Sequence, residues 1–165
     1  MGSIAWFPLL AMFAGAAQAA ATPPTLSPTD QAAAFKAAGF SQRGGQWRSP
    51  CDDPGTPGYT PGSIEQVADL NGDGRPEAIV TEGSSFCYGM TGQSYTLVSQ
   101  QADGRWKRMA TGIGIPIFLE TRGAKGWPDL QIGGPGFCFP VERWNGREYR
   151  HNRFEYEGKR CKGPR

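Results

Sequence analysis

An internal repeat of about 51 residues restricts the possible folds of this chain more than any other feature of its sequence. In each half a proline, Pro76 or Pro128, opens a short strand-like stretch. A Gly-rich loop and an aromatic-Cys-aromatic triplet follow in both halves. The chain has 24 Gly, 14 Pro and many aromatic residues, with little helical periodicity, so we expect it to be mainly β.

Tight-turn dipeptides mark a hairpin in each half, Asp103-Gly104 in the first and Asn145-Gly146 in the second. Strand-like residues 64–68 and 115–121 would open the two halves, which predicts two antiparallel four-strand units. A repeat of this length with several strands is typical of a propeller blade, but two blades cannot close a ring. We therefore expect two blade-like sheets that pack together.

One short helix is predicted near the amino terminus. Ser27 is a suitable N-cap, Pro28 suits the first helical position and Asp30 lies three residues after the cap. Gly39 ends the pattern. Because Phe35 stands among alanines, we expect the helix to pack one thin apolar face on the β domain.

A hairpin is predicted over residues 40–49, with its turn at Gly44-Gly45 and Trp47 as its packing residue. Residues 52–62 are Asp, Pro, Gly and Thr in irregular order, which indicates a long loop.

The first half contains an acidic loop at residues 69–77, called the 69–77 loop below. Side-chain oxygens of Asp69, Asn71 and Asp73 alternate along it, and intervening glycines permit a tight curl. The carbonyl of Arg75 and the carboxylate of Glu77 would complete a ligand set of hard oxygen atoms. The loop therefore predicts a Ca²⁺ site. The alternative is a solvated turn that binds no metal.

A strand, not a helix, should follow the loop. An EF-hand places a bidentate Glu at position 12, where this chain has Val80. The stretch resembles the calcium loops of FG-GAP and VCBS-type repeats, the blades of integrin-like propellers, through Asp69, Asn71, Asp73, Gly74 and Glu77. The resemblance covers about a dozen residues and implies one metal loop, since residues 123–127 of the second half contain no acidic donor.

Residues 1–19 have the features of a secretory signal peptide. An apolar run ends in Ala17-Gln18-Ala19 and is too short to span a bilayer. The remaining chain suits one domain without a membrane span. Residues 20–62 would form an amino-terminal extension, and residues 63–165 the two-repeat domain, divided into 63–112 and 113–165.

The four cysteines agree with export to the periplasm or the cell exterior, because their even number and spacing favour disulfides over a metal or redox motif. Three pairings are possible. We favour Cys51 with Cys87 and Cys138 with Cys161, which gives each half its own link.

No reaction is indicated by the remaining residues. The one histidine, His151, lies in a strand-like stretch, the pair Glu120 and Asp129 is best explained as strand ends, and no nucleophile motif occurs. The net charge of +2 is spread over the chain, which argues against a nucleic-acid partner. We expect a monomer without enzymatic activity.

Aromatic residues near the turns favour a binding role, although packing in the core is the commoner use of tryptophan. The candidate loops cover residues 83–92 and 133–140. The aromatic candidates are Trp47, Tyr88, Trp106, Trp127, Phe137, Phe139 and Trp144. The sequence thus favours a calcium-binding β module for a protein or glycan; the alternatives are an inhibitor or immunity-type protein of an extracytoplasmic enzyme and a small calcium-dependent hydrolase.

Overall fold

The computed structural model describes residues 25–163, so the expected signal peptide at residues 1–19 lies outside the described residues. The first helix, α1 (Pro28–Ala37), begins where the sequence predicts, because the Ser27 side chain accepts a hydrogen bond from the Asp30 N–H at 3.1 Å. Gly39 follows the helix with φ of 91°. Its left-handed backbone suits glycine and ends the helix.

The predicted hairpin of the amino-terminal extension is formed by β1 (Ser41–Arg43) and β2 (Gln46–Arg48). The ring of Trp47 stacks on Phe35 of α1 at 4.7 Å between centroids, which confirms its packing role.

The first large sheet is a meander in the order β3-β4-β5-β6. Its strands are β3 (Thr60–Ala68), β4 (Glu77–Gly83), β5 (Gln93–Gln100) and β6 (Trp106–Ile113). The predicted loop over residues 52–62 is therefore shorter, because residues 60–62 belong to β3.

The second large sheet repeats the meander as β7-β8-β9-β10 and adds β11 at its edge. Its strands are β7 (Ile115–Arg122), β8 (Pro128–Gly133), β9 (Phe139–Trp144), β10 (Tyr149–Tyr156) and β11 (Lys159–Arg160). The prediction of two four-strand sheets is thus wrong by one strand. Positive φ angles at Glu157 and Gly158 turn the chain back, and β11 pairs with the end of β10.

The prediction of a single helix is also incomplete. A four-residue helix, α2 (Ser85–Tyr88), continues into the 3₁₀ turn η1 (Gly89–Thr91), and a second 3₁₀ turn, η2 (Ala124–Gly126), joins β7 to β8. The Ser84 side chain caps α2 by accepting a hydrogen bond from the Cys87 N–H. No helix within residues 25–163 is long and apolar enough to cross a membrane.

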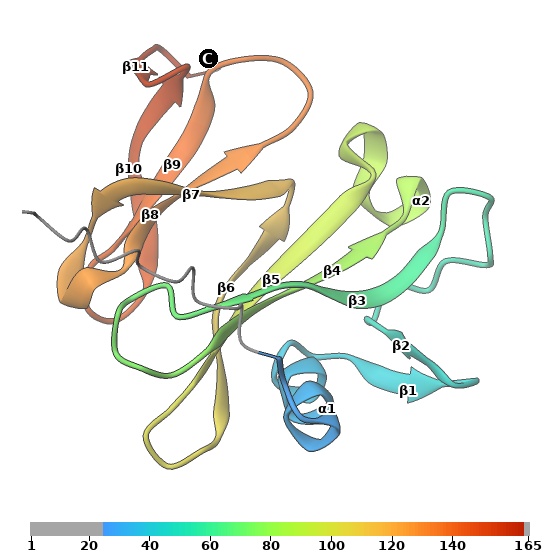
Figure 1. The fold of residues 1–165 in the computed structure, drawn as a ribbon. Helices are drawn as coiled ribbons and strands as arrows, with labels where there is room; N and C mark the ends of the chain where they lie inside the picture. The colour runs from blue at the N-terminus through green and yellow to red at the C-terminus, as the bar shows by residue number, and fades with distance from the viewer. Residues whose placement is uncertain (1–24, 164–165) are drawn as a thin grey trace, which may run out of the picture.

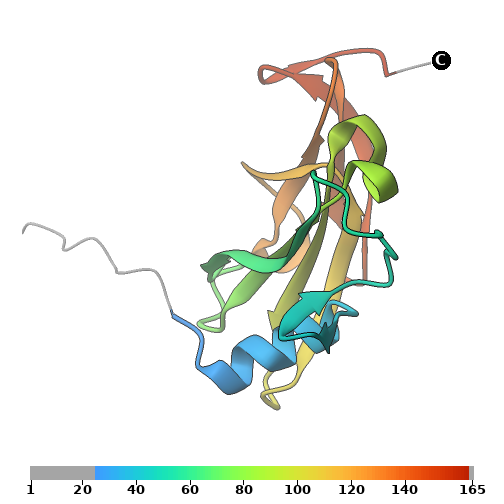
Figure 2. The same cartoon turned by 90° about the vertical axis from the view of Figure 1, so that its right-hand side faces the viewer.

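Three layers result, with α1 and the small hairpin on one side of the first sheet and the second sheet on its other side (Figures 1 and 2). Alternation along β4 directs Ala78 and Val80 toward α1, whereas Ile79 packs with Leu130 and Trp144 of the second sheet. The two halves of the repeat therefore share a core.

Both predicted disulfides are present, and all four cysteines are paired. Cys51–Cys87 joins the amino-terminal extension to α2, and Cys138–Cys161 joins the β8–β9 loop to the segment after β11.

Candidate metal centre and loop-end groove

The 69–77 loop joins β3 to β4 and is closed by its own hydrogen bonds. Asp69 Oδ1 accepts from the backbone N–H groups of Gly72 and Asp73 at 2.8 and 3.1 Å, and its Oδ2 accepts from Gly74 at 2.8 Å. Asn71 Oδ1 accepts from the Asp73 N–H at 2.8 Å. The side-chain oxygens of Asp69 and Asn71 therefore lie on one tightly curled turn.

A guanidinium group already neutralises one carboxylate of this loop. Arg75 Nη2 lies 2.6 Å from Asp73 Oδ2, and Arg75 Nε donates to the Gln100 carbonyl at 3.2 Å. A metal ion at Asp73 would have to displace this cation or share the carboxylate with it.

Glu77, the last residue of the loop, carries a fully buried carboxylate. It accepts hydrogen bonds from Ser99 Oγ at 2.7 Å and from the Leu70 N–H at 2.8 Å. Within residues 25–163 no Lys, Arg or His forms an ion pair with it. Burial raises the pKa of Glu77; the two hydrogen bonds oppose this rise, and the nearby charges of Asp73 and Asp69 add to it.

The donor chemistry of the loop fits a hard cation, since every candidate ligand atom is oxygen. The described part of the chain does not gather three or more His, Cys, Asp or Glu side chains into a metal-binding group. Asn71 and the Arg75 carbonyl would therefore have to contribute, and Asp69 and Asp73 would exchange hydrogen bonds for the ion. The uncompensated Glu77 carboxylate is the structural feature that argues for a missing positive charge.

The matching position of the second half, Asp129, has no exposed surface either, but two arginines neutralise it. Arg143 donates to both carboxylate oxygens at 2.8 and 2.9 Å, and Arg153 and Thr121 each donate to Oδ2 at 2.7 Å. Burial alone would raise the pKa of Asp129, but these donors lower it to about 2. Arginine thus supplies in this half the charge that the first half lacks.

The turn η2 replaces the metal loop in the second half and packs against the 69–77 loop. A side chain at Gly126 would bring its Cβ within 2.6 Å of the Asn71 carbonyl oxygen, so only glycine fits there. Arg122 bridges the two turns by donating to the carbonyls of Leu70 and Gly126 at 2.6 and 2.9 Å.

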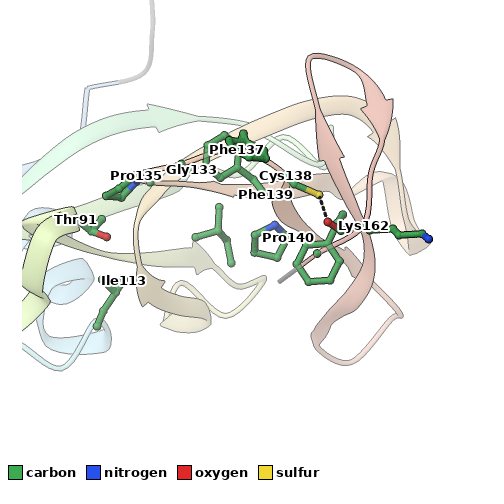
Figure 3. Close-up of a pocket in the computed structure, with 14 residues that line it drawn as sticks. Thr91, Ile113, Gly133, Pro135, Phe137, Cys138, Phe139, Pro140 and Lys162 are labelled. Carbon is green, nitrogen blue, oxygen red and sulfur yellow. Dashed lines mark hydrogen bonds between the residues drawn. The ribbon is translucent and has the colours of Figure 1, made fainter. Parts of the chain in front are cut away.

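An apolar groove opens at the opposite end of the strands, where the two Gly-rich loops of the repeat meet. Its volume is about 630 Å³. Figure 3 shows Thr91 and Ile113 at one side and Cys138 with Lys162 at the other. The loop-end groove has these lining residues: Thr91, Ile113, Ile132, Gly133, Gly134, Pro135, Gly136, Phe137, Cys138, Phe139, Pro140, Phe154, Lys162 and Gly163.

Phe137 is the most exposed aromatic residue of the groove, with 78% of its surface accessible. It meets Tyr156 edge-on at 6.3 Å and precedes Cys138, whose disulfide anchors the loop. The Cys138 sulfur approaches the Lys162 carbonyl at 3.0 Å, a contact and not a hydrogen bond, because a disulfide sulfur carries no proton (Figure 3).

Buried acids that sequence reasoning missed hold the loops beside the groove. Glu82 accepts hydrogen bonds from the Tyr59 and Tyr88 hydroxyls at 3.0 and 2.6 Å and from the backbone and side chain of Ser49. Burial and the Glu82 contact raise the pKa of Tyr59 to about 12. No local sequence signal marks this cluster, since its donors come from separate segments.

Asp53 organises the long loop in the same way. It accepts from the N–H groups of Gly55 and Thr56, from the Thr56 hydroxyl and from Ser84 Oγ at 2.6 Å. Burial favours the neutral acid, but these donors lower the pKa of Asp53 to about 2. The Asp-Pro-Gly-Thr sequence at residues 53–56 was a usable turn signal.

The aromatic candidates divide between core and surface. Trp127 and Trp144 are buried, and Trp47 and Trp106 pack beside the α1 layer, as the core alternative predicts. Of the aromatic candidates in the sequence, Phe137 and Phe139 line the groove, whereas Tyr88 binds Glu82. His151 is exposed and contacts Phe154.

Comparisons with protein-family models, curated proteins and solved structures gave no match to this chain. The resemblance of the 69–77 loop to FG-GAP and VCBS-type loops therefore stays a prediction from the loop residues.

Proposed function

We propose that this chain is an extracytoplasmic binding module that holds an apolar segment of a protein partner in the loop-end groove. The observation that carries the proposal is the exposure of Phe137 on a loop anchored by Cys138–Cys161. Exposed aromatic side chains beside a concave apolar surface are typical of protein interaction sites.

The composition of the groove favours a protein segment over a glycan. Thr91 and Lys162 are the two lining residues with polar side chains, and the rest of the lining is apolar, glycine or disulfide-bonded cysteine. A sugar needs several hydrogen-bonding groups in its site, whereas an apolar peptide side chain needs a dry surface and free backbone groups. Gly134 and Gly136, which lie in the loop between β8 and β9, provide such backbone groups.

The proposed calcium ion would serve stability rather than contact with the partner. The 69–77 loop and the groove lie at opposite ends of β4, whose seven residues span roughly 20 Å. Asp69, Asn71, Asp73, the Arg75 carbonyl and Glu77 would hold the ion. The buried, unpaired carboxylate of Glu77 supports this assignment.

Export of the chain is supported by its disulfides, which persist in oxidising compartments. The absence of an enzymatic role is part of the proposal. His151 contacts Phe154, and Asp129 is saturated by two arginines and Thr121, so neither is placed as a general base.

The binding role is tested by placing a photo-crosslinking phenylalanine analogue at position 137 in the exported protein. The crosslinked protein is identified, purified and titrated against the wild type, Phe137→Ser and Phe86→Ser. Phe86 is a matched control because it is 64% exposed but does not line the groove. We expect the Phe137 change to weaken binding at least about tenfold, while the control has little effect. Equal affinities of the two variants would contradict a groove-centred site, and recovery of glycan alone would contradict a protein partner.

Inhibition of an extracytoplasmic enzyme is a second candidate function. A protruding aromatic on a loop tied by a disulfide could enter an enzyme cleft as a rigid wedge. If the crosslinked partner is a hydrolase, its activity should fall in proportion to bound protein, and Phe137→Ser should relieve the inhibition. Unchanged hydrolase activity in the complex would leave the binding role and reject inhibition.

A further inference from the structure

A small polar pocket lies between the 69–77 loop and the second sheet, at the end of the molecule remote from the groove. Its volume is about 210 Å³, which suits a small chemical group better than a large ligand. Arg75 and Asp73 of the loop border the pocket, as do Lys107 of β6 and Lys125 of η2.

Positive charge dominates this pocket. Among the side chains that line the pocket, Arg75, Lys107 and Lys125 contribute three positive charges and Asp73 one negative charge, so the lining carries +2. The Glu77 carboxylate lies behind this lining and is hydrogen-bonded to Ser99. Asp73 is already paired with Arg75 at 2.6 Å. Neither lysine forms an ion pair within residues 25–163. Two unpaired ammonium groups at one concave site attract an anion.

The backbone of Lys125 is the second observation. Its φ and ψ angles are 55° and 33°, in the left-handed region that residues with a Cβ rarely occupy. Glycine or asparagine would adopt these backbone angles at a lower conformational free energy. Strained backbone of this kind gathers at functional sites, so a lysine here indicates a use for its side chain.

An unpaired buried donor is the third observation. Trp144 lines the pocket, is only 5% exposed, and its indole Nε1–H has no hydrogen-bond partner in the described structure. Leaving such a donor without an acceptor is costly, so the indole N–H of this lining residue is a candidate donor to a bound oxygen atom.

We propose that this pocket binds a small oxyanion, namely a carboxylate, phosphate or sulfate group, between Lys107 and Lys125, with the Trp144 indole N–H as a further donor. The anion can be free or part of a larger acidic ligand. The proposal depends neither on the partner in the groove nor on a metal in the 69–77 loop.

The test follows the indole N–H signals of ¹⁵N-labelled protein by NMR at constant ionic strength, with the Trp144 signal assigned through Trp144→Phe. Phosphate, sulfate, acetate and glucuronate are titrated separately in EDTA and again with calcium, and chloride and glucose serve as controls. We expect the Trp144 signal to move saturably with an oxyanion in EDTA. A shift with phosphate or sulfate alone would indicate a site for inorganic anions. A shift with acetate or glucuronate alone would indicate a site for carboxylates.

Two sets of variants complete the test. The double variant Lys107→Ala and Lys125→Ala should weaken oxyanion binding at least about tenfold. Lys36→Ala is the control, because Lys36 is an exposed residue of α1, and it should leave binding unchanged.

Lys125→Gly should weaken oxyanion binding while raising the melting temperature, because glycine relieves the strain of the left-handed backbone. A Trp144 signal that ignores all four anions, moves equally in the double lysine variant, or moves only with calcium would overturn the proposal.

Discussion

Glu77 and Asp129 stand at the same position of the two halves, and both carboxylates are fully buried, but among residues 25–163 an ion-pair partner is found for Asp129 and not for Glu77. Arg143 and Arg153 approach Asp129 at 2.8 and 2.7 Å. Glu77 receives two neutral hydrogen bonds and faces two further acids of its own loop. A buried charge without a counter-charge is costly, so the first half is the one that would gain from a bound cation.

Removing these two charges should therefore have different effects on the free energy of unfolding. Asp129→Ala leaves the guanidinium of Arg153 without its partner, and the Arg153 side chain is only 9% exposed. This change should destabilise the fold by about 3 kcal/mol. Glu77→Gln in EDTA should be neutral or stabilising, because the amide keeps hydrogen-bonding capacity without a buried charge. Urea unfolding at neutral pH measures both; a larger loss for Glu77→Gln than for Asp129→Ala would contradict the difference between the halves.

Stability should fall in acid between about pH 4 and pH 2. The folded pKa values of Asp129 and Asp53 lie at about 2, below the ordinary value of 3.8. Groups with a depressed folded pKa stabilise the protein above the unfolded pKa, and this contribution is lost as pH falls through the folded pKa. Urea midpoints across this range check the slope, and Asp129→Asn should flatten it. A slope that Asp129→Asn and Asp53→Asn leave unchanged would show that other groups control the acid response.

Arg75 should compete with calcium for Asp73. Its guanidinium lies 2.6 Å from the carboxylate, whereas the proposed ligand from this residue is the backbone carbonyl. Arg75→Ala should therefore tighten calcium binding by about threefold, because it removes a nearby positive charge and keeps the carbonyl. Arg105→Ala is the control, since Arg105 forms the same 2.6 Å pair with Asp103 in a different turn. Calorimetric titration that shows weaker binding in Arg75→Ala would rule out this competition.

Exported protein should begin near Ala20 and contain no free thiol, since both disulfides are formed. Alkylation before reduction should add no mass, and alkylation after reduction should label four cysteines. Labelling of any cysteine before reduction, or an intact amino terminus at Met1, would contradict export with cleavage of residues 1–19.

Local signals made much of the fold predictable. The cap at Ser27, the Asp103-Gly104 and Asn145-Gly146 turns and the strand-like stretch around Ile79 act within a few residues, and the structure contains the helix, hairpins and strand that they indicate. The repeat also predicted that two meanders would pack together. Short-range physics was sufficient in these places because each signal determines its own backbone geometry.

Other features depended on contacts between distant segments or on an unusual backbone. Ser84 starts helix α2 in the first half, whereas Pro135 and its neighbouring glycines leave the second half without one, so equivalent sequences differ in structure. β11 requires a positive φ at Glu157, which glutamate rarely adopts. The Glu82 cluster draws its donors from separate segments, and no local pattern could predict it. The Gly-rich composition of residues 83–92 and 133–140 marked both loops as candidates, but it could not show that they meet at one groove.

Calcium dependence of thermal stability tests the central claim most directly. Melting curves of the disulfide-bonded protein are measured in EDTA, in millimolar Mg²⁺ and in millimolar Ca²⁺, for the wild type and Asp73→Ala. Binding to the folded state alone adds about 2.7 kcal/mol at a hundredfold excess over Kd, which corresponds to several degrees in a domain of this size. We predict this rise for calcium, a smaller rise for magnesium because of its stricter octahedral geometry, and none in Asp73→Ala. A wild-type melting curve that is the same in calcium and in EDTA would contradict the claim and leave the 69–77 loop a turn closed by its own hydrogen bonds.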